Sequence, residues 1–208
     1  MVIHGSERSF EFSALPYFSA ADDCGGLVRR QSCRHIVDIA SGNGNFAVNH
    51  RAMRPTDVDV DFAAQAIELA REARRAGNHP FGAVLVLDGK IVLRARNTVA
   101  TDRDPTAHAE TNLVAAAIQE LAPDQRRRSV LYSSCEPCAM CAGKMYWAGI
   151  RSVVFALSSE ELAALAGRDF LIPCRELFER ATEPVQVAGP LPLNAAREVH
   201  LGFWPPAV

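Results

Sequence analysis

The chain has 208 residues, of which 49% are hydrophobic, and its formal net charge at pH 7 is -2. This length and composition suffice for one compact core but fall short of two full domains, and the near-neutral charge counts against a nucleic-acid-binding surface. No apolar run approaches the roughly 20 residues that span a bilayer, and the six cysteines, three of them clustered, indicate a reducing compartment, predicted to be the cytoplasm.

The first 56 residues differ from the rest of the chain because they show no sustained hydrophobic periodicity. They mix scattered aromatic residues with glycine-rich stretches such as Ser41-Gly42-Asn43-Gly44-Asn45, which predicts a poorly ordered N-terminal extension over residues 1–56. Regular structure is expected to begin at Thr56 or Asp57, either of which can cap a helix whose apolar face runs to Gly77. Residues 57–208 are therefore predicted to form one folded domain.

Two strand-like runs follow this first helix. Residues 83–87 and 91–95 are rich in β-forming residues, and Asp88-Gly89 between them is the strongest short hairpin signal, so these strands are predicted to be antiparallel. The later elements alternate: a helix from His108, a strand over 129–133, a helix from Cys138 to near Gly149, a strand over 152–156, a helix ending at Leu165, a helical turn over 176–179 and a strand over 185–187.

The alternation of strands and helices predicts the fold class. Strands that are separated by helices pair in parallel, because a crossover helix returns the chain to the same edge of the sheet. Together with the antiparallel hairpin, this predicts an α/β fold, a three-layer α/β/α sandwich on a mixed sheet of about five strands, with the functional site near the carboxyl ends of the strands. The densest basic run, Arg126-Arg127-Arg128, is expected to be a solvated connection and not a nucleic-acid patch.

The motif His108-Ala109-Glu110 places a potential metal ligand and a carboxylate two positions apart. Residues with this spacing point about 200° apart on a regular helix, so their side chains converge only at a helix's first turn. The turn-forming run Asp104-Pro105-Thr106 precedes the motif, and an apolar stripe follows it until Pro123. This arrangement predicts that the motif lies at the start of a helix.

The motif Pro137-Cys138-Ala139-Met140-Cys141 supplies two more potential ligands. Cys138 and Cys141 are three apart and share one face of a helix, and proline is favoured at a helix's first turn. Two helix N-termini would then point at one ion, where their positive dipole ends favour thiolate over thiol. Together with His108, the cysteines make three ligands, and a catalytic zinc takes three protein ligands and leaves its fourth position to water. Glu110 would serve that water as the catalytic proton carrier.

Two other interpretations exist for a Cys-x-x-Cys pair, namely a redox pair or part of a structural zinc site. A redox pair has no use for Glu110. A structural site needs a fourth ligand, and the nearby candidate, Cys135, precedes Pro137 in the expected strand-to-helix loop, where it is interpreted as a small buried residue. The catalytic interpretation is therefore favoured.

Residues 57–204 resemble the cytidine/deoxycytidylate deaminase superfamily and, within it, the branch of guanine deaminases and tRNA adenosine deaminases. The segments that carry the resemblance are Pro80-Phe81-Gly82-Ala83-Val84, Arg96-Asn97, Asp104 to Glu110 and Ser134 to Gly143. The resemblance implies a Zn2+ cofactor, with His108, Cys138 and Cys141 as its ligands and Glu110 as the residue that moves protons. It also favours a homodimer.

The resemblance further implies three substrate-binding residues. Asn97 corresponds to an asparagine that holds the purine or the sugar, although its residue type is also common in turns. Trp147 corresponds to an aromatic residue that lines the base pocket, although an aromatic on a helix is also typical of a core. Asp169 falls where guanine deaminases place an acidic residue that pairs with guanine, although the run 168–175 departs from the usual pattern. His79, at the entrance to the first strand, can touch substrate or lie on the surface.

Three functions are consistent with these residues. The first is a zinc-dependent hydrolytic deaminase of a free nucleobase or nucleoside, with guanine or a related amino-heterocycle as the substrate and ammonia as a product. The second is a tRNA-specific adenosine deaminase, which must grip an anticodon loop with a basic surface, and the net charge of -2 counts against it. The third is a non-catalytic domain stabilised by zinc, which has no need for Glu110.

Phe203-Trp204 would close the pocket of its own chain or of a partner subunit, or cap the sheet.

Overall fold

The computed structural model describes residues 57–167 and 172–205. The predicted poorly ordered extension over residues 1–56 therefore lies outside the described residues. Within them, one sheet has the strand order β2-β1-β3-β4-β5. The strands are β1 (Gly82–Leu87), β2 (Lys90–Arg96), β3 (Val130–Cys135), β4 (Ser152–Leu157) and β5 (Gln186–Ala188). The helices are α1 (Asp57–Arg75), α2 (Val99–Asp102), α3 (Ala109–Glu120), α4 (Pro123–Arg128), α5 (Ala139–Trp147), α6 (Ser159–Ala166), α7 (Cys174–Glu179) and α8 (Asn194–Glu198).

The predicted hairpin is confirmed, because β1 and β2 are antiparallel neighbours. Asp88 and Gly89 both have positive φ angles, 50° and 74°. Two consecutive positive φ angles are the mark of the two-residue turn whose twist matches that of the flanking strands. The hairpin makes β2 the edge of the sheet, with side chains that alternate between exposed and half-buried.

The pairing of β3 differs in part from the prediction. β3 pairs with β4, and β4 with β5, in parallel as expected, but β3 is antiparallel to its other neighbour, β1. The reason is that the connection through α2, α3 and α4 carries the chain past β1 instead of back to β2. Because β1 is antiparallel to both neighbours, β2 and β3 run in the same direction without being adjacent.

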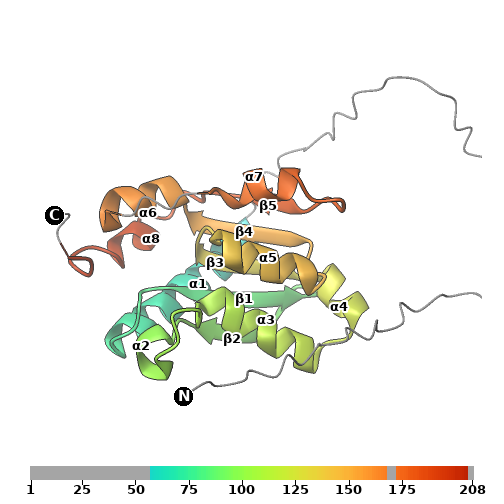
Figure 1. Ribbon diagram of the computed structural model, residues 1–208, viewed down its shortest axis with the longest axis horizontal. Coiled ribbons are helices and arrows are strands. Elements are labelled where there is room, and N and C mark those ends of the chain that lie inside the picture. The colour runs from blue at the N-terminus through green and yellow to red at the C-terminus, as the bar shows by residue number, and fades with distance from the viewer. Residues whose placement is uncertain (1–56, 168–171, 206–208) are drawn as a thin grey trace, which may run out of the picture. The chain divides into compact units, whose positions relative to one another are not determined.

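Helices cover both faces of the sheet, which confirms the three-layer α/β/α sandwich. Figure 1 shows α3 and α5 in front of the sheet and α1 behind it. The first hydrophobic core joins one face of the sheet to α3, α5 and α7 and includes Leu85, Leu113, Leu131, Met145, Phe155 and Phe178. The second core joins the other face to α1 and α8 and includes Ile67, Val84, Tyr132, Val154 and Ala196. The interior strand β1 is buried along its whole length, since helices pack on both of its faces.

A close approach between α1 and β1 requires glycine at position 82. A Cβ atom there would overlap the carbonyl oxygen of Ala66 and lie 2.6 Å from the backbone nitrogen of Ala70. The backbone N–H of Gly82 also donates to the hydroxyl of Ser134 at 3.1 Å. These contacts fix the start of β1, and with it Phe81, next to the carboxyl end of β3.

The run Arg126-Arg127-Arg128 lies in the connection between α3 and β3, as predicted, where it forms the second half of the short helix α4. The side chains of Arg127 and Arg128 are 62% and 54% exposed. Each arginine has a partner within the chain: Arg126 Nε donates to the carbonyl oxygen of Ala148 at 2.8 Å, Arg127 pairs with Glu183 at 2.9 Å and Arg128 pairs with Asp88 at 2.7 Å. These arginines therefore join α4 to neighbouring elements.

Among the described helices, none is long and apolar enough to cross a bilayer.

The C-terminal aromatic residues pack against the segment that leads into β1. Trp204 Nε1 donates to Nδ1 of the buried His200 at 3.3 Å, and their rings stack at an interplanar angle of 12°. The rings of His200 and Trp204 lie 5.2 and 6.1 Å from that of Phe81. Burial lowers the pKa of His200 to about 4, so its ring is neutral at pH 7. Trp204 thus lies beside Phe81, which lines the cavity, and closure of the pocket of this chain or of a partner subunit stays a prediction.

Candidate metal centre

The starts of two helices meet at one point beyond the carboxyl end of β3. His108 is the N-cap of α3 and Cys138 is the N-cap of α5, both with extended backbone, while Cys141 lies in the first turn of α5. The predicted placement of His108 and Glu110 at a helix start is therefore observed. Pro137 was predicted within the first turn, but α5 begins at Ala139, because Cys138 still has extended dihedral angles, and Pro137 precedes the cap.

The three predicted ligand atoms have the spacing of a tetrahedral zinc site. The sulfurs of Cys138 and Cys141 are 3.6 Å apart, and Nδ1 of His108 lies 3.7 Å from the former and 3.5 Å from the latter. With bonds of about 2.3 Å to sulfur and about 2.0 Å to nitrogen, a tetrahedral zinc separates two sulfurs by about 3.8 Å and sulfur from nitrogen by about 3.6 Å. The donor set and its geometry thus fit this ion. Among the described residues, these three form the cluster able to hold a metal.

The two thiols form a hydrogen bond with each other, and a bound cation would take the place of its proton. The hydrogen bond between the sulfurs of Cys138 and Cys141 lowers the pKa of Cys138 to about 4 and raises that of Cys141. Metal binding releases protons from such thiols, because only thiolate is a good ligand. Cys135, the last residue of β3, is fully buried, and burial raises the pKa of its thiol well above the usual range. This agrees with its interpretation as a small buried residue.

Glu110 lies against the ligands without belonging to the set of three. Its Oε1 accepts a hydrogen bond from the hydroxyl of Ser133 at 2.8 Å, and its Oε2 lies 3.6 Å from the sulfur of Cys141. The side chain is buried, and burial raises the pKa of its carboxyl group. A carboxyl group with a raised pKa beside a metal site is suited to accept and return protons near neutral pH.

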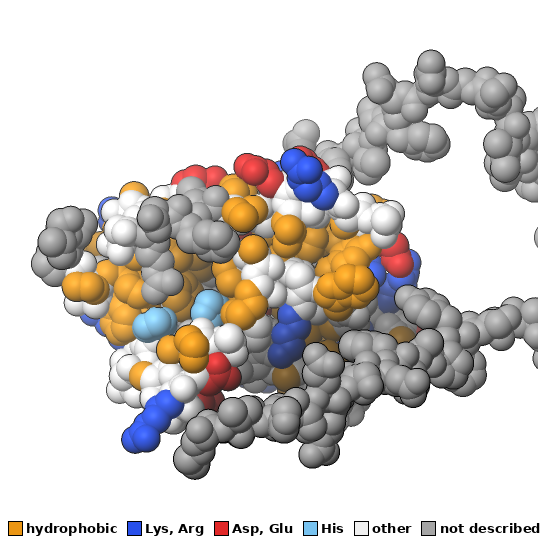
Figure 2. Space-filling view, viewed as in Figure 1, with side chains coloured by type: hydrophobic (Ala, Val, Ile, Leu, Met, Phe, Trp, Pro, Cys, Tyr) orange, Lys and Arg blue, Asp and Glu red, His pale blue; other side chains and the backbone are white. Residues whose placement is uncertain are grey.

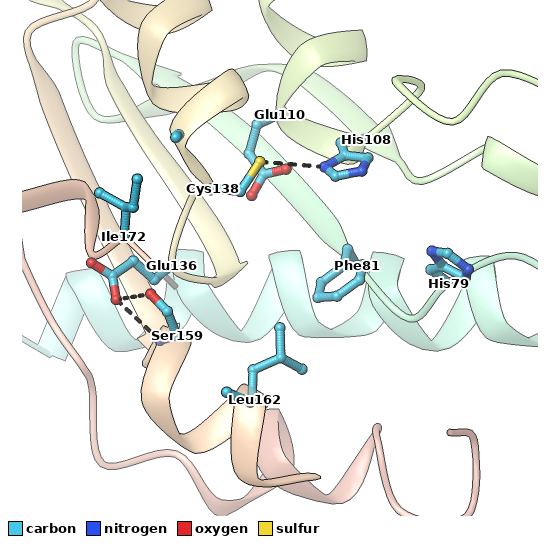
Figure 3. A pocket seen from close by; sticks show the side chains of 11 residues that line it. His79, Phe81, His108, Glu110, Glu136, Cys138, Ser159, Leu162 and Ile172 are labelled. Atoms are coloured by element: carbon cyan, nitrogen blue, oxygen red, sulfur yellow. Dashed lines mark hydrogen bonds between the residues drawn. The ribbon is translucent and has the colours of Figure 1, made fainter. Parts of the chain in front are cut away.

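A small cavity of about 100 Å³ opens onto this centre. Its lining includes His79, Phe81, His108, Glu110, Glu136, Cys138, Ser159, Leu162 and Ile172. Figure 3 shows Glu110, His108 and Cys138 close together, with Ile172, Glu136 and Ser159 at one end of the cavity and His79 at the other. Of the two sequence interpretations of His79, a place at the cavity is therefore the one observed.

The three predicted substrate-binding residues lie in different surroundings. Asn97 is fully buried just after β2, where its backbone N–H donates to the carbonyl oxygen of Phe81 at 3.0 Å. Its Oδ1 accepts from the N–H of Val99 at 3.1 Å, while its Nδ2 has no partner within the described residues. Trp147 is 86% exposed and does not line the cavity, because it is the last residue of α5 and the ligands lie at the opposite end. Asp169 lies outside the described residues.

The sequence predicts no functional role for Glu136, Leu162 or Ile172. All three line the cavity. For Glu136 a signal was available, since an acidic residue between a buried strand and a ligand motif must find hydrogen-bond donors. Leu162 and Ile172 follow an ordinary apolar pattern, and nothing in the sequence distinguishes them from core residues.

The chain is similar to known proteins over this region. Residues 56–157 match the cytidine and deoxycytidylate deaminase zinc-binding region. A probable cytosine deaminase of Schizosaccharomyces pombe is 35% identical over 154 residues, 72% of this chain and 94% of the relative. A guanine deaminase of Bacillus subtilis is 42% identical over 123 residues, 59% of this chain and 78% of the relative. A solved structure from studies of tRNA:A34 deaminases has a TM-score of 0.54 and 28% identity, and the match covers 67% of this chain and 99% of that one.

The ligand set can be tested by metal content. We expect purified protein to carry one zinc per chain, measured by inductively coupled plasma mass spectrometry. Cys141→Ser is expected to lose most of this zinc, because a hydroxyl is a much poorer ligand than a thiolate. Cys135→Ala removes a buried thiol outside the set and should keep it. A Cys141→Ser protein with the zinc content of the wild type would contradict the assignment.

Proposed function

Because this chain belongs to the cytidine/deoxycytidylate deaminase superfamily of zinc-dependent hydrolytic deaminases, we propose that it removes the amino group of a free nucleobase, with guanine as its substrate. The observation that carries this proposal is the cavity of about 100 Å³ with Glu110 and the metal ligands His108 and Cys138 in its wall. A cavity of this size accommodates a small molecule better than a macromolecular segment.

Guanine is proposed as the base because the guanine deaminase relative shares 42% identity over 123 residues of this chain. Two features count against tRNA as the substrate. The net charge is -2, and the arginines of α4 are engaged in contacts within the chain. A tRNA-binding protein needs free cations to neutralise phosphates.

Zinc bound at this centre would supply Lewis acidity, which would lower the pKa of a water molecule toward neutrality. Glu110 takes one proton from the attacking water and gives it to the ring nitrogen, and it then takes the second proton from the hydroxyl formed on the ring carbon and gives it to the departing amine. The water oxygen forms the new bond to the ring carbon, the carbon–nitrogen bond breaks and ammonia leaves. The hydroxyl of Ser133 holds Oε1 of Glu110, so that Oε2 stays on the side of Cys141.

We propose that Asn97 and Phe81 hold the base. Asn97 does not line the cavity, and its buried Nδ2 is a donor without a partner within the described residues. We infer that an acceptor of the bound heterocycle satisfies this donor, because a buried N–H without a partner is costly. Phe81 presents an apolar aromatic wall to the cavity, which suits a flat ring. Asp169 keeps its proposed role of pairing with the donor-rich edge of guanine.

We also propose that the protein is a homodimer. Large hydrophobic side chains of α3 and α5 remain exposed, namely Ile118 at 44%, Met140 at 39% and Trp147 at 86%. Figure 2 shows hydrophobic side chains gathered on the face that α3 and α5 cover. Exposed apolar groups of this size favour association, because burial removes them from water. Trp147 thus belongs to the proposed interface and not to this chain's own cavity.

The substrate can be tested by ammonia release from guanine, cytosine, adenine and guanosine, with inosine formation measured on tRNA. We expect guanine to give the highest kcat/KM. Glu110→Gln should keep zinc but lose roughly 10² to 10⁴ in kcat, because an amide cannot carry the protons. Inosine formation that exceeds ammonia release from every free base would favour the tRNA function, and an active Glu110→Gln enzyme would refute the role of Glu110.

The role of Asn97 can be separated from a turn-forming role by two variants. Asn97→Asp keeps an oxygen for the N–H of Val99 but removes the Nδ2 donor, whereas Asn97→Ala removes both. We expect both to raise KM for guanine by roughly 10-fold or more, the value of one lost hydrogen bond to a buried partner. If Asn97→Asp binds guanine as the wild type does, the donor has no role.

The dimer can be tested by sedimentation equilibrium. The wild type is expected to sediment as a dimer and Trp147→Glu as a monomer, because a carboxylate in an apolar interface is costly. Val92→Glu, at a 39% exposed position of the edge strand β2, is the matched control and should remain a dimer. A monomeric wild type, or a Trp147→Glu protein that dimerises equally well, would contradict the proposal.

A further inference from the structure

The carboxylate of Glu136 holds together three segments around the cavity. Its Oε2 accepts hydrogen bonds from the backbone N–H of Ser159, at 3.0 Å, and from the Ser159 hydroxyl. Its Oε1 accepts from the backbone N–H of Cys174 at 2.8 Å. Ser159 and Cys174 are the first residues of α6 and α7. The side chain is buried, with 8% of its surface exposed, and Figure 3 shows its bonds to Ser159.

These partners require a group that only accepts. The two backbone N–H groups can only donate hydrogen bonds, and a carboxylate offers acceptor sites on both of its oxygens. The isosteric amide of glutamine would put an NH₂ group in place of one oxygen. In either orientation of that amide, the N–H of Ser159 or the N–H of Cys174 would face a donor. Glutamine can therefore hold one of the two helix starts but not both.

The segments that Glu136 joins form one wall of the cavity. Leu162 lies on α6, and Ile172 lies just before α7, and both line the cavity. Glu136 itself is two residues before Cys138, and its backbone N–H donates to the carbonyl oxygen of Leu157 at the end of β4 at 2.8 Å. One carboxylate thus fixes the apolar wall relative to the loop that carries a metal ligand.

We propose that Glu136 is a positioning residue that sets the width of the substrate cavity, by holding the starts of α6 and α7 against the Cys138 loop. It determines how well a flat base fits between this wall and Phe81, and it takes no part in proton transfer. This inference rests on the proposed deaminase function, since the cavity is the same one.

The test compares Glu136→Gln with Glu160→Gln, which removes the same charge from an exposed position of α6 one residue after Ser159. With guanine as substrate, we expect Glu136→Gln to raise KM roughly 10-fold, because a misplaced wall weakens binding of substrate and transition state alike. Zinc content, kcat and the pH dependence of kcat should stay within about 2-fold of the wild type. Glu160→Gln should leave KM unchanged.

A second variant keeps the test sharp if Glu136→Gln folds poorly. Ser159→Ala removes only the hydroxyl donor and keeps the backbone N–H, so it should raise KM by a smaller factor. Because both substitutions act on one carboxylate, their effects should be non-additive in the double variant. Two results would overturn the proposal: a fall in kcat with a changed pH profile, which would mean proton transfer, or a lower melting temperature with unchanged KM, which would mean a purely structural role.

Amide hydrogen exchange, followed by NMR, separates this inference from the proposed function. The amides of Ser159 and Cys174 should exchange faster in Glu136→Gln than in Glu160→Gln, because at least one of them has lost its acceptor. This readout needs no substrate. If no base in the panel is deaminated, faster exchange still supports the positioning role, and equal exchange in both variants overturns it.

Discussion

The convergence of two helix starts on one point is the constraint on which the site depends. His108 and Cys138 are N-caps, so their side chains leave α3 and α5 where the backbone N–H groups have no partners within the helix and the dipoles are positive. Both features favour negative charge on the cysteine sulfurs and on a bound substrate near the two helix starts. A displacement of either helix along its axis would separate donor atoms that now lie 3.5 to 3.7 Å apart.

The sheet enforces this convergence from two directions. The carboxyl end of β3 leads directly into the Cys138 loop, and parallel pairing with β4 brings Leu157 beside Glu136. From the other side, antiparallel pairing of β1 with β3 brings Gly82 next to Ser134. Because β1, β3 and β4 are covered on both faces, register shifts would expose core residues, and the positions of Phe81, Ser133 and Cys138 follow from that register.

The residues that local rules govern are the ones that the sequence could predict. Side chains two residues apart, such as those of His108 and Glu110, converge only at a helix start, and Asp88-Gly89 favours a two-residue hairpin turn. Both features could therefore be predicted. The antiparallel pairing of β1 with β3 was not, because a crossover rule gives the direction of β3 but not its neighbour. The role of Glu136 could not be predicted for a similar reason, because its partners Ser159 and Cys174 lie 23 and 38 residues later in the chain.

Two buried carboxylates line the same cavity, and their donors give them different tasks. Glu136 accepts hydrogen bonds from the backbone N–H and the hydroxyl of Ser159, which anchor the start of α6, and from the backbone N–H of Cys174, which anchors the start of α7. A donor in place of either oxygen of Glu136 would remove an acceptor site that the fold requires. Glu110 accepts from the hydroxyl of Ser133, and its other oxygen lies 3.6 Å from the sulfur of Cys141, so that none of its contacts involves α6 or α7. Proton transfer at Glu110 can therefore proceed while the wall that Glu136 holds stays in place, which separates the chemistry of the site from its shape.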